Sequence, residues 1–429
     1  MTLEKGQHIE TGIVWLKDIP SHWELIKMRY LCDITTGDKD TENREDDGKY
    51  PFFVRSQTIE KISTFSFDGE AILTAGDGVG VCKVWHYVNG KFDFHQRVYM
   101  MSNFKKVSGS FLFYFLKENF IHEVLKLSAK STVDSLRRPM FLDFPVAVPP
   151  LQEQTQIAKY LDYQTNIIDQ LIEKKEKLVI LLQEQRQAII NEAVTKGLDP
   201  NAKMKDSGIE WLGEIPEKWT IAKTKHITIN VTDGAHVSPD LSSDDFPFIS
   251  TVNIGNRGQI DWANCLHTSS ESYHSLVANG CRPKIGDVLY SKDGTIGKTT
   301  IIDFEREFVV ASSLLIIRPN PDLIESEFLN YLFHSNFVNQ QIDQLLSGVA
   351  LRRISITKFS NLEMIIPPLN VQKKIVNAIK AKVNLLNSVL DLINDQIIKL
   401  KEYRQSIISE AVTGKIDLRE WQAPKSAIA

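Results

Sequence analysis

Two long stretches of the chain carry apolar residues at alternating spacings of four and three. Seven of ten such positions from Ile157 to Ile189 are apolar, and eight of ten from Ile375 to Ile407. Neither Pro nor Gly interrupts residues 152–196 or 370–413. This spacing gives a helix one apolar stripe, whereas a half-buried strand would alternate with a period of two. The pattern predicts two helices of about 42 residues, each roughly 60 Å long.

Both stretches follow a Pro-Pro pair and lead into a glycine, Gly197 or Gly414, as is typical of a helix start and a C-terminal cap. A lone helix with such a stripe would expose it to water, so each stripe needs a partner. The other helix of the chain is the favoured partner. Because each helix follows a globular unit, we expect an antiparallel pair with the units at opposite ends of one rod. The alternative is that each helix packs on its own unit.

The regions before the helices predict strands joined by glycine turns. In the first, YPFFVRSQTI, EAILTAGDGVGVCKVWHYV and FDFHQRVYMM have this pattern, and in the second FPFISTVNI, DVLYSKDGTIGKTTIID and FVVASSLLIIRP. FLFYFLKENF (111–120) and FLNYLFHSNF (328–337) each predict a short helix. The fold class is therefore α+β, with two strand-rich mixed units and two long helices.

The chain is a tandem duplication of a unit of about 200 residues. RQAIINEAVT (186–195) returns as RQSIISEAVT (404–413), and TGIVWLKDIPSHWEL (11–25) returns as SGIEWLGEIPEKWTI (207–221). VPPLQEQ (148–154) returns as IPPLNVQ (366–372), and Leu-Arg-Arg occurs at 136–138 and 351–353. The copies differ most in their middles. These echoes predict globular domains at 1–150 and 206–366, with helical segments at 151–205 and 367–429.

Composition narrows the class of protein. The chain has 429 residues, 42% of them hydrophobic, and a net charge of −4, which argues mildly against a non-specific nucleic-acid coat. The N-terminus lacks the apolar run of a signal peptide, and we expect a cytoplasmic protein without a membrane segment. Four cysteines without a CxxC pair indicate neither a zinc site nor a disulfide framework.

No catalytic or metal motif emerges. GTIGKTT (294–300) lacks the first glycine of a phosphate-binding loop, because that place is Lys292, and GDGVG (76–80) lacks dinucleotide spacing, so both predict turns. An amino-methyltransferase needs an Asn or Asp before Pro-Pro and an aromatic residue after it. Here Val148 and Ile366 precede the prolines and Leu follows them. We therefore expect no catalytic residue and no metal site.

Taken together, the motifs resemble the specificity subunits of type I restriction–modification systems over essentially the whole chain. The resemblance rests on GIxWLxxIPxxW before each variable domain, on PPL before each long helix, and on RQxIIxEAVT at its end. ITINVTDGAHVSPDLSSDDFPFISTVNI (227–254) is similar to the entry of a target-recognition domain in that family. The first copy departs there, since residues 34–59 contain no DGxH, which implies a different half-site.

The resemblance implies two target-recognition domains joined by a coiled coil with a pseudo-twofold duplication, and no chemistry on this chain. It implies binding of a two-part, asymmetric double-stranded DNA sequence, one half per domain. Two methyltransferase subunits and two motor-nuclease subunits are the implied partners. S-adenosylmethionine, ATP and Mg²⁺ would be bound by those partners, with no cofactor on this chain. Two readers set ~34–36 Å apart could engage one side of B-DNA, so the rod would set the unread spacer.

Loop-borne donors and acceptors are the candidates for DNA contact, because phosphate contacts position a protein and base contacts specify the sequence. A solvated turn or a surface ion pair is the alternative for each of them, most of all for Asp233 in its Asp-Gly turn. The candidates are Arg55, Ser56, Gln57, Asp77, Arg137 and Arg138 in the first domain, and Thr232, Asp233, His236, Lys292, Arg352 and Arg353 in the second. The shared Leu-Arg-Arg favours phosphate over a particular base.

The repeated decamer predicts two equivalent docking ends on the helices. Arg186, Glu192, Arg404 and Glu410 are its candidates for setting the register of a bound subunit. Three alternatives stay open: a specificity subunit of another multisubunit restriction system, a coiled-coil scaffold without DNA selectivity, and a stand-alone restriction–methylation enzyme. The last would need the methyltransferase motifs that the sequence lacks.

Overall fold

The computed structural model describes residues 8–128, 135–238, 240, 243–346 and 353–424. It forms two compact units, and their boundary crosses both long helices, so that each unit contains a part of each helix. Unit 1 consists of Met1–Glu176 and Asn394–Ala429, and unit 2 of Lys177–Ile393. The division into four sequence segments stays a prediction.

The two long helices are α4, Leu151–Thr195, and α10, Leu369–Val412. Each begins directly after its Pro-Pro pair, as predicted. Gly197 and Gly414, which follow the helix ends, have φ values of 83° and 74°. This left-handed conformation suits a glycine at a helix C-terminus, because a side chain there would be strained. The periodic pattern therefore located both helices.

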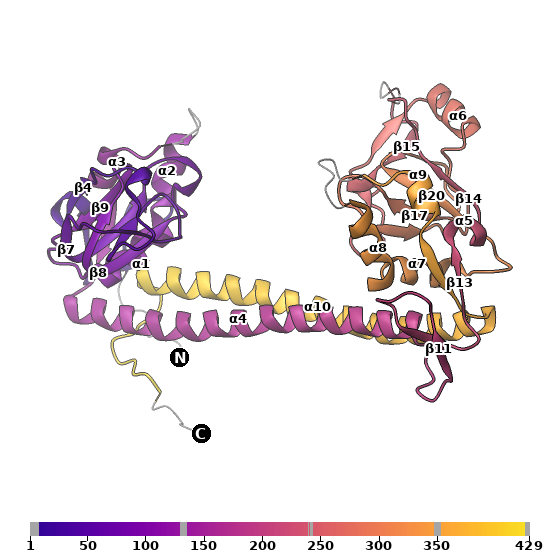
Figure 1. The fold of residues 1–429 in the computed structure, drawn as a ribbon. Coiled ribbons are helices and arrows are strands. Elements are labelled where there is room, and N and C mark those ends of the chain that lie inside the picture. The colour runs from indigo at the N-terminus through magenta and orange to yellow at the C-terminus, as the bar shows by residue number, and fades with distance from the viewer. Residues whose placement is uncertain (1–7, 129–134, 239, 241–242, 347–352, 425–429) are drawn as a thin grey trace. The chain divides into compact units, whose positions relative to one another are not determined.

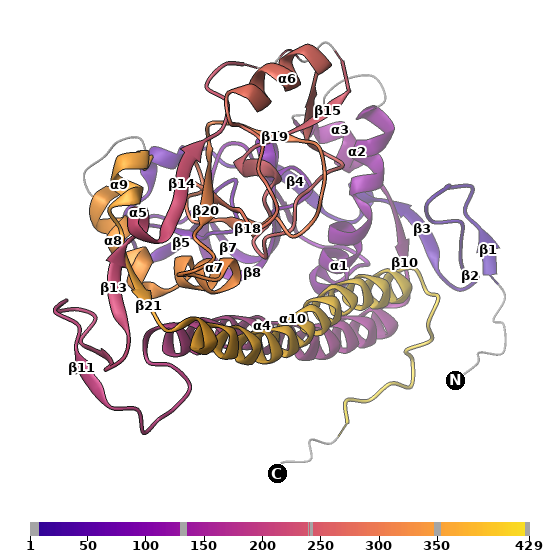
Figure 2. The same cartoon turned by 90° about the vertical axis from the view of Figure 1, so that its right-hand side faces the viewer.

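Within each unit, part of α4 lies against part of α10, as both views show (Figure 1, Figure 2). In unit 1, Arg404 Nε donates to Asp169 Oδ1 at 2.8 Å and Lys401 Nζ lies 3.3 Å from Glu176 Oε1. One number rises as the other falls, so the pair is antiparallel. In unit 2 both helices also pack on the globular domain, since Ile190 of α4 and Ile375 of α10 belong to one buried cluster with strand residues such as Val288. The predicted antiparallel pair is confirmed; the placement of the units at opposite ends of one rod stays a prediction.

A buried glutamine ties the start of each long helix to its domain. Gln154 and Gln372 are both 0% exposed. The Gln154 amide accepts from Ser108 N at 2.7 Å and donates to Lys106 O at 2.9 Å and Pro149 O at 2.7 Å. The last residue of the repeated VPPLQEQ and IPPLNVQ motifs is therefore a structural residue, because all its hydrogen-bonding groups are satisfied inside the domain.

Gln372 makes the equivalent set of contacts in unit 2. It accepts from Glu325 N at 2.9 Å and donates to Leu323 O at 2.9 Å and Pro367 O at 2.8 Å. The duplication thus extends to individual hydrogen bonds.

Unit 1 is built on a six-stranded sheet in the order β4-β9-β7-β8-β5-β6, with β3 and β10 paired beside it. All pairs are antiparallel except β5 with β8. The helices α1 to α3 follow the sheet in the chain. The strands are β1 His8–Glu10, β2 Asp18–Pro20, β3 Glu24–Lys27, β4 Asp33–Thr36, β5 Tyr50–Phe53, β6 Glu60–Ile62, β7 Phe67–Ala75, β8 Trp85–Phe94, β9 Val98–Ser102 and β10 Pro145–Val148, and the helices are α1 Gly109–Asn119, α2 Ile121–Ser128 and α3 Arg138–Leu142.

Unit 2 has a similar plan, in sheets ordered β14-β20-β17-β18 and β16-β15-β19. Its strands are β11 Met204–Asp206, β12 Glu214–Pro216, β13 Thr220–Lys223, β14 Thr228–Asp233, β15 Phe246–Ile249, β16 Leu266–Thr268, β17 Val288–Ser291, β18 Thr299–Ile301, β19 Val309–Val310, β20 Leu314–Pro319 and β21 Glu363–Ile366. Its helices are α5 Thr224–Ile227, α6 Ser270–Ala278, α7 Ser326–Phe333, α8 Asn336–Leu346 and α9 Ile356–Ser360.

One difference between the units lies in strand β8. It pairs with β7 along Trp85–Phe92 and, in parallel, with β5 at Asp93 and Phe94. In unit 2 the same two tasks fall to separate strands: β18 pairs with β17, and β19 pairs in parallel with β15. Residues 302–308 lie between them, so one six-stranded sheet becomes two smaller sheets. The predicted α+β class, with two strand-rich units, is confirmed.

Each unit also contains short segments outside its main sheet. The hairpins β1-β2 and β11-β12 contain the repeated TGIVWL and SGIEWL stretches. In unit 1 the C-terminal tail lies against α4, where the Trp421 ring packs edge-on against Tyr160 with centroids 5.2 Å apart. Trp421 also lies 5.7 Å from the ring of Tyr163. The tail is therefore part of the packing of unit 1.

Candidate nucleic-acid interface

The candidate residues gather where several strands of each sheet begin or end. In unit 1, β4 and β7 end beside the start of β9, and in unit 2, β14 and β17 end beside the start of β20. The main chain comes very close at this edge. A Cβ on Gly37 would lie 2.0 Å from Phe94 O, and one on Gly234 would lie 2.1 Å from Val310 O. Both units therefore share one backbone frame that only glycine fits at this position.

Hydrogen bonds give the correspondence residue by residue. Gly76 N donates to Arg97 O at 2.8 Å in unit 1, and Lys292 N donates to Ser313 O at 3.0 Å in unit 2. The Asp-Gly turns at 77–78 and 293–294 come directly after these donors, and Gly78 and Gly294 have φ values of 70° and 69°. The two turns are therefore equivalent in the fold. Asp77 thus corresponds to Asp293, and Arg97 to Ser313.

In unit 1 the frame holds two arginines on one carboxylate. Arg55 Nη1 donates to Asp77 Oδ1 at 2.9 Å, and Arg97 Nη1 donates to Asp77 Oδ2 at 2.5 Å. The side chains of Arg55 and Arg97 are 44% and 62% exposed, and that of Asp77 is 14% exposed. Partial burial raises the pKa of Asp77, but the hydrogen bonds from Arg97 and Arg55 outweigh it and keep this pKa below its usual value. The group is an ion-paired cluster with two cations facing solvent.

The two other candidates from this loop serve the loop itself. Ser56 Oγ donates to Thr58 O at 3.0 Å, and Gln57 Nε2 donates to Lys83 O at 3.0 Å. Both residues lie beside Arg55 on the segment that follows β5. Their side-chain hydrogen bonds fix the course of this segment and leave Arg55 as its charged group.

In unit 2 a carboxylate again gathers two basic side chains, but at another position. Asp233, at the end of β14, accepts from His236 Nε2 at 2.8 Å and from Lys292 Nζ. The Lys292 side chain is 3% exposed, whereas that of His236 is 62% exposed. Burial raises the pKa of Asp233, and the hydrogen bonds from Lys292 and His236 outweigh it, so this pKa too lies below its usual value. Asp233, His236 and Lys292 are brought together; Thr232 lies beside them in β14, half-buried.

The Asp-Gly turn of unit 2, at residues 293–294, is paired with one arginine from another segment. Arg353 Nε lies 3.7 Å from Asp293 Oδ2, and the Arg353 side chain is 47% exposed. Asp293 directly follows Lys292, so this pair lies next to the Asp233 cluster. Arg352 falls outside the described residues.

Arg353, the last residue of the second Leu-Arg-Arg, does not occupy the position of Arg138 in unit 1, which corrects the sequence interpretation. Leu136 N donates to Gly76 O at 2.6 Å, and its equivalent donor is Ile354 N, which binds Lys292 O at 3.0 Å. Arg353 therefore corresponds to Ser135, since Ser135 is bridged to Asp77 as Arg353 is to Asp293. The sequence match is shifted by three residues against the fold, so the argument for a shared phosphate contact no longer holds.

Arg137 and Arg138 lie at the start of α3 and are exposed. They follow Leu136, and so lie close in the chain to the contact with Gly76. Arg97 is the residue that sequence reasoning missed. It lies in the short connection between β8 and β9, in the stretch FDFHQRVYMM that was assigned to a strand. The polar His-Gln-Arg interruption of this apolar run was the available signal.

The docking candidates on the helices differ between the units. Arg404 forms two hydrogen bonds to Asp169, at 2.8 and 3.1 Å, so it is engaged within the helix pair of unit 1. Glu410 accepts from Ser406 Oγ at 2.8 Å, one helical turn away. Neither contact tests a role in docking, and that role stays a prediction.

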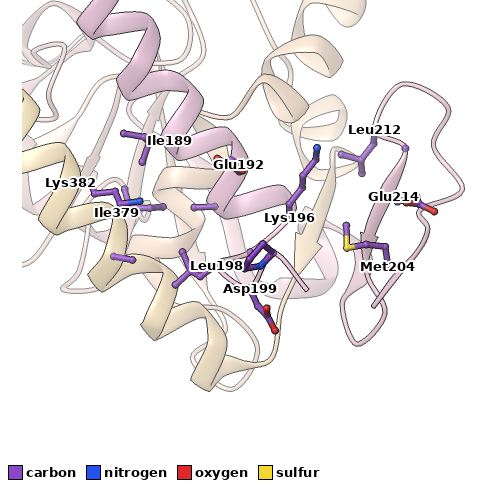
Figure 3. A pocket seen from close by; sticks show the side chains of 15 residues that line it. Ile189, Glu192, Lys196, Leu198, Asp199, Met204, Leu212, Glu214, Ile379 and Lys382 are labelled. Carbon is purple, nitrogen blue, oxygen red and sulfur yellow. The ribbon is translucent and has the colours of Figure 1, made fainter. Parts of the chain in front are cut away.

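In unit 2, Glu192 lines a groove of about 810 Å³ between the end of α4, the segment after it, the β11-β12 hairpin and α10 (Figure 3). Ile189, Ile379 and Leu212 supply apolar wall, and Lys196 and Lys382 supply charge. Arg186 lies at a second cavity, where its Nε finds no hydrogen-bond partner among the described residues.

Among the residues that the structure describes, no group of three or more His, Cys, Asp or Glu side chains is placed to hold a metal ion. Across the same residues, no helix is both long and apolar enough to cross a membrane.

Comparisons with known proteins agree on one family. The family model described as "Type I restriction modification DNA specificity domain" matches residues 20–180 and 238–401, which lie one in each half of the duplication. The chain is 23% identical to the type I restriction enzyme EcoDI specificity subunit of Escherichia coli, over 94% of this chain and 91% of that one. It is also 23% identical to the MjaVIII specificity subunit of Methanocaldococcus jannaschii, over 94% of both chains.

A solved structure has the same fold. A chain from a structure described as the assembly and conformational transition of the type I R-M system aligns with a TM-score of 0.68 and 14% identity. The alignment covers 93% of this chain and 99% of that one.

Proposed function

The chain belongs to the type I restriction–modification DNA specificity family, and from this premise we propose that its two units each bind one half of a bipartite, asymmetric DNA target. The chain is the non-catalytic specificity subunit, so sequence choice is its task and the chemistry lies elsewhere. DNA contact is assigned to the strand edge around Gly37 in unit 1 and the equivalent edge around Gly234 in unit 2.

The observation that carries the proposal is that one backbone frame bears different charged groups in the two units. Arg97 of unit 1 corresponds to Ser313, which is neutral. The cations of unit 2 come instead from Lys292, which replaces Gly76, and from Arg353, which replaces Ser135. The glycine contacts give both units the same backbone frame, while the hydrogen-bond donors on it stand at different positions. This arrangement suits two domains that bind different base sequences.

The ion pairs at these edges support direct DNA contact. Each arginine of the Asp77 cluster uses one terminal nitrogen for the carboxylate in the described contacts, which leaves its Nε and Nη2 donors for a base or a phosphate. Holding a guanidinium in place lowers the conformational cost of binding. The same argument applies to His236 on Asp233.

Partner subunits complete the proposal. Methyltransferase subunits dock on the chain and modify adenine N6 with S-adenosylmethionine, and motor-nuclease subunits join them with ATP and Mg²⁺. The repeated helix ends support two docking places, with Arg186, Glu192, Arg404 and Glu410 as candidate contacts. No residue of this chain is assigned to a cofactor.

Mapping N6-methyladenine by long-read sequencing tests this function. A methylation-free host would express the cognate methyltransferase subunit with this chain and, separately, without it. One split motif that appears only with this chain is the expected result. If the methyltransferase marks the same sites without it, the chain does not choose the sequence, and a coiled-coil scaffold becomes the better account.

A further inference from the structure

Two arginines at equivalent positions of the duplicated helices differ in their surroundings. Arg186 and Arg404 open the two copies of the repeated decamer. Arg404 is paired with Asp169 on the neighbouring helix. The same offset of 218 residues that relates the arginines relates Asp169 to Asn387. The carboxylate of unit 1 is therefore replaced by a neutral amide in unit 2.

Arg186 has no carboxylate partner among the described residues of its own unit. Its Nε is buried, and within the described part of the chain no atom accepts a hydrogen bond from it. Burial lowers the pKa of Arg186; the nearby Tyr331 raises it and Arg257 lowers it, and the effect of burial dominates. Arg257 itself is already paired, through two hydrogen bonds of 2.9 and 2.8 Å to Asp391. A partly buried guanidinium without an acceptor is costly, because desolvation is not offset by a hydrogen bond.

Arg186 lines a cavity of about 410 Å³ that is rich in hydrogen-bond donors. Asn387 lines the same cavity, so the place of the missing carboxylate is open space. His334 also lines it; its Nε2 lies 2.7 Å from Thr299 Oγ1, and burial, followed by the charge of Arg186, lowers the pKa of His334 to about 4. The charged residues of the wall are Arg186, Arg257 and Asp303, and its neutral polar residues include Asn256, Gln259, Asn330, Asn384 and Asn387.

We propose that this cavity of unit 2 binds a carboxylate group, which pairs with Arg186 as Asp169 pairs with Arg404 in unit 1. A guanidinium with neighbouring amides suits a carboxylate, because two parallel N–H donors match its two oxygens. The carboxylate can belong to a small anion in solution or to an Asp or Glu side chain of a bound protein. The first source does not depend on the proposed function, and the second rests on the docking of a methyltransferase subunit.

The first experiment measures the Tm of the full-length chain in sodium acetate and in sodium chloride at equal ionic strength. Anions also act on stability through general solvation, so the informative quantity is the acetate gain of the wild type minus that of Arg186→Gln. We expect an excess of about 2 °C for the wild type, because a ligand that binds only the folded state stabilises it. Arg404→Gln is the matched control and should keep the excess, although its own Tm falls.

Asn387→Asp is the sharper variant, since it restores inside unit 2 the carboxylate that unit 1 has. It should raise the Tm in chloride and abolish the acetate excess, because Arg186 would then be paired within the chain. This variant also keeps the test valid if Arg186→Gln folds poorly.

The second experiment separates the two sources through the affinity for the cognate methyltransferase subunit. If its carboxylate fills the cavity, Arg186→Gln and Asn387→Asp each weaken that affinity about tenfold or more. If the ligand is a small anion, the affinity stays unchanged and the acetate excess is present. The proposal is overturned if the wild type and Arg186→Gln have the same acetate gain and the same affinity. Failure of the methylation experiment leaves the acetate result standing, so the two proposals fail separately.

Discussion

Arg97 donates from Nη1 to Oδ2 of Asp77 at 2.5 Å, although 20 residues separate them in the chain. The main chain of Arg97 is held as well, because its carbonyl accepts from Gly76 N. The arginine is thus fixed at both ends while 62% of its side chain faces solvent. A guanidinium prepared in this way is a candidate for bidentate contact with guanine O6 and N7.

We expect Arg97→Ala to relax one base position in one half of the methylated motif. A lost bidentate base contact costs roughly 1–3 kcal/mol of discrimination. Long-read mapping of N6-methyladenine in the presence of the methyltransferase subunit is the measurement. Arg353→Ala should instead affect the other half, because Arg353 belongs to unit 2.

Arg419→Ala is the matched control for Arg97→Ala. Arg419 is an exposed arginine of unit 1 that is also held by one carboxylate, Asp417, but it lies in the C-terminal tail. Its loss should leave the motif unchanged. Uniform weakening of DNA binding by Arg97→Ala, with a salt slope reduced by about one unit, would mean that Arg97 contacts phosphate and not a base.

The Asp77 cluster should make stability depend on pH in the acid range. Because the folded state lowers the pKa of Asp77, its stabilising effect is present above the unfolded value, about 3.9, and is lost as the pH falls through the folded pKa. The difference in unfolding free energy between wild type and Asp77→Asn should therefore be largest above pH ~4 and shrink below it. Urea unfolding at several pH values measures this, and an equal difference at every pH would contradict it.

The buried glutamines should be essential to stability in both units. Gln154→Leu leaves Ser108 N and two carbonyls without partners, and we expect a loss of about 2–4 kcal/mol of unfolding free energy. Gln372→Leu should have a similar effect in unit 2. Denaturant unfolding followed by circular dichroism is the measurement. Gln152→Leu, at an exposed position of the same helix, is the control and should change little.

The C-terminal tail should contribute to unit 1 through Trp421. Trp421→Ala removes the ring contacts with Tyr160 and Tyr163 and should lower stability by about 1–3 kcal/mol, since the side chain is half-buried. Trp421→Phe keeps an aromatic ring and should recover part of the loss. Thermal unfolding distinguishes them; two variants with wild-type Tm would show that the tail is not needed.

The amino-acid sequence alone determined the features that depend on residues close together along the chain. Apolar spacing, the Pro-Pro starts and the terminal glycines located α4 and α10, because helix periodicity and capping involve residues only a few places apart. The duplicated motifs predicted two like units, and the family resemblance followed from their order. The turns at 76–80 and 294–300 were assigned for the same local reason.

Only the tertiary structure decided which side chains meet. The strand order places β9 beside β7, and this brings Arg97 to Asp77, a contact that no spacing in the sequence indicates. The structure also aligns Arg353 with Ser135 and not with Arg138, because the hydrogen bonds to the carbonyls of Gly76 and Lys292 set the register of the two units. Arg186 and Arg404 occupy equivalent places in the repeated decamer. Their contacts differ because the facing helix has Asn387 at the position opposite Arg186 and Asp169 at the position opposite Arg404.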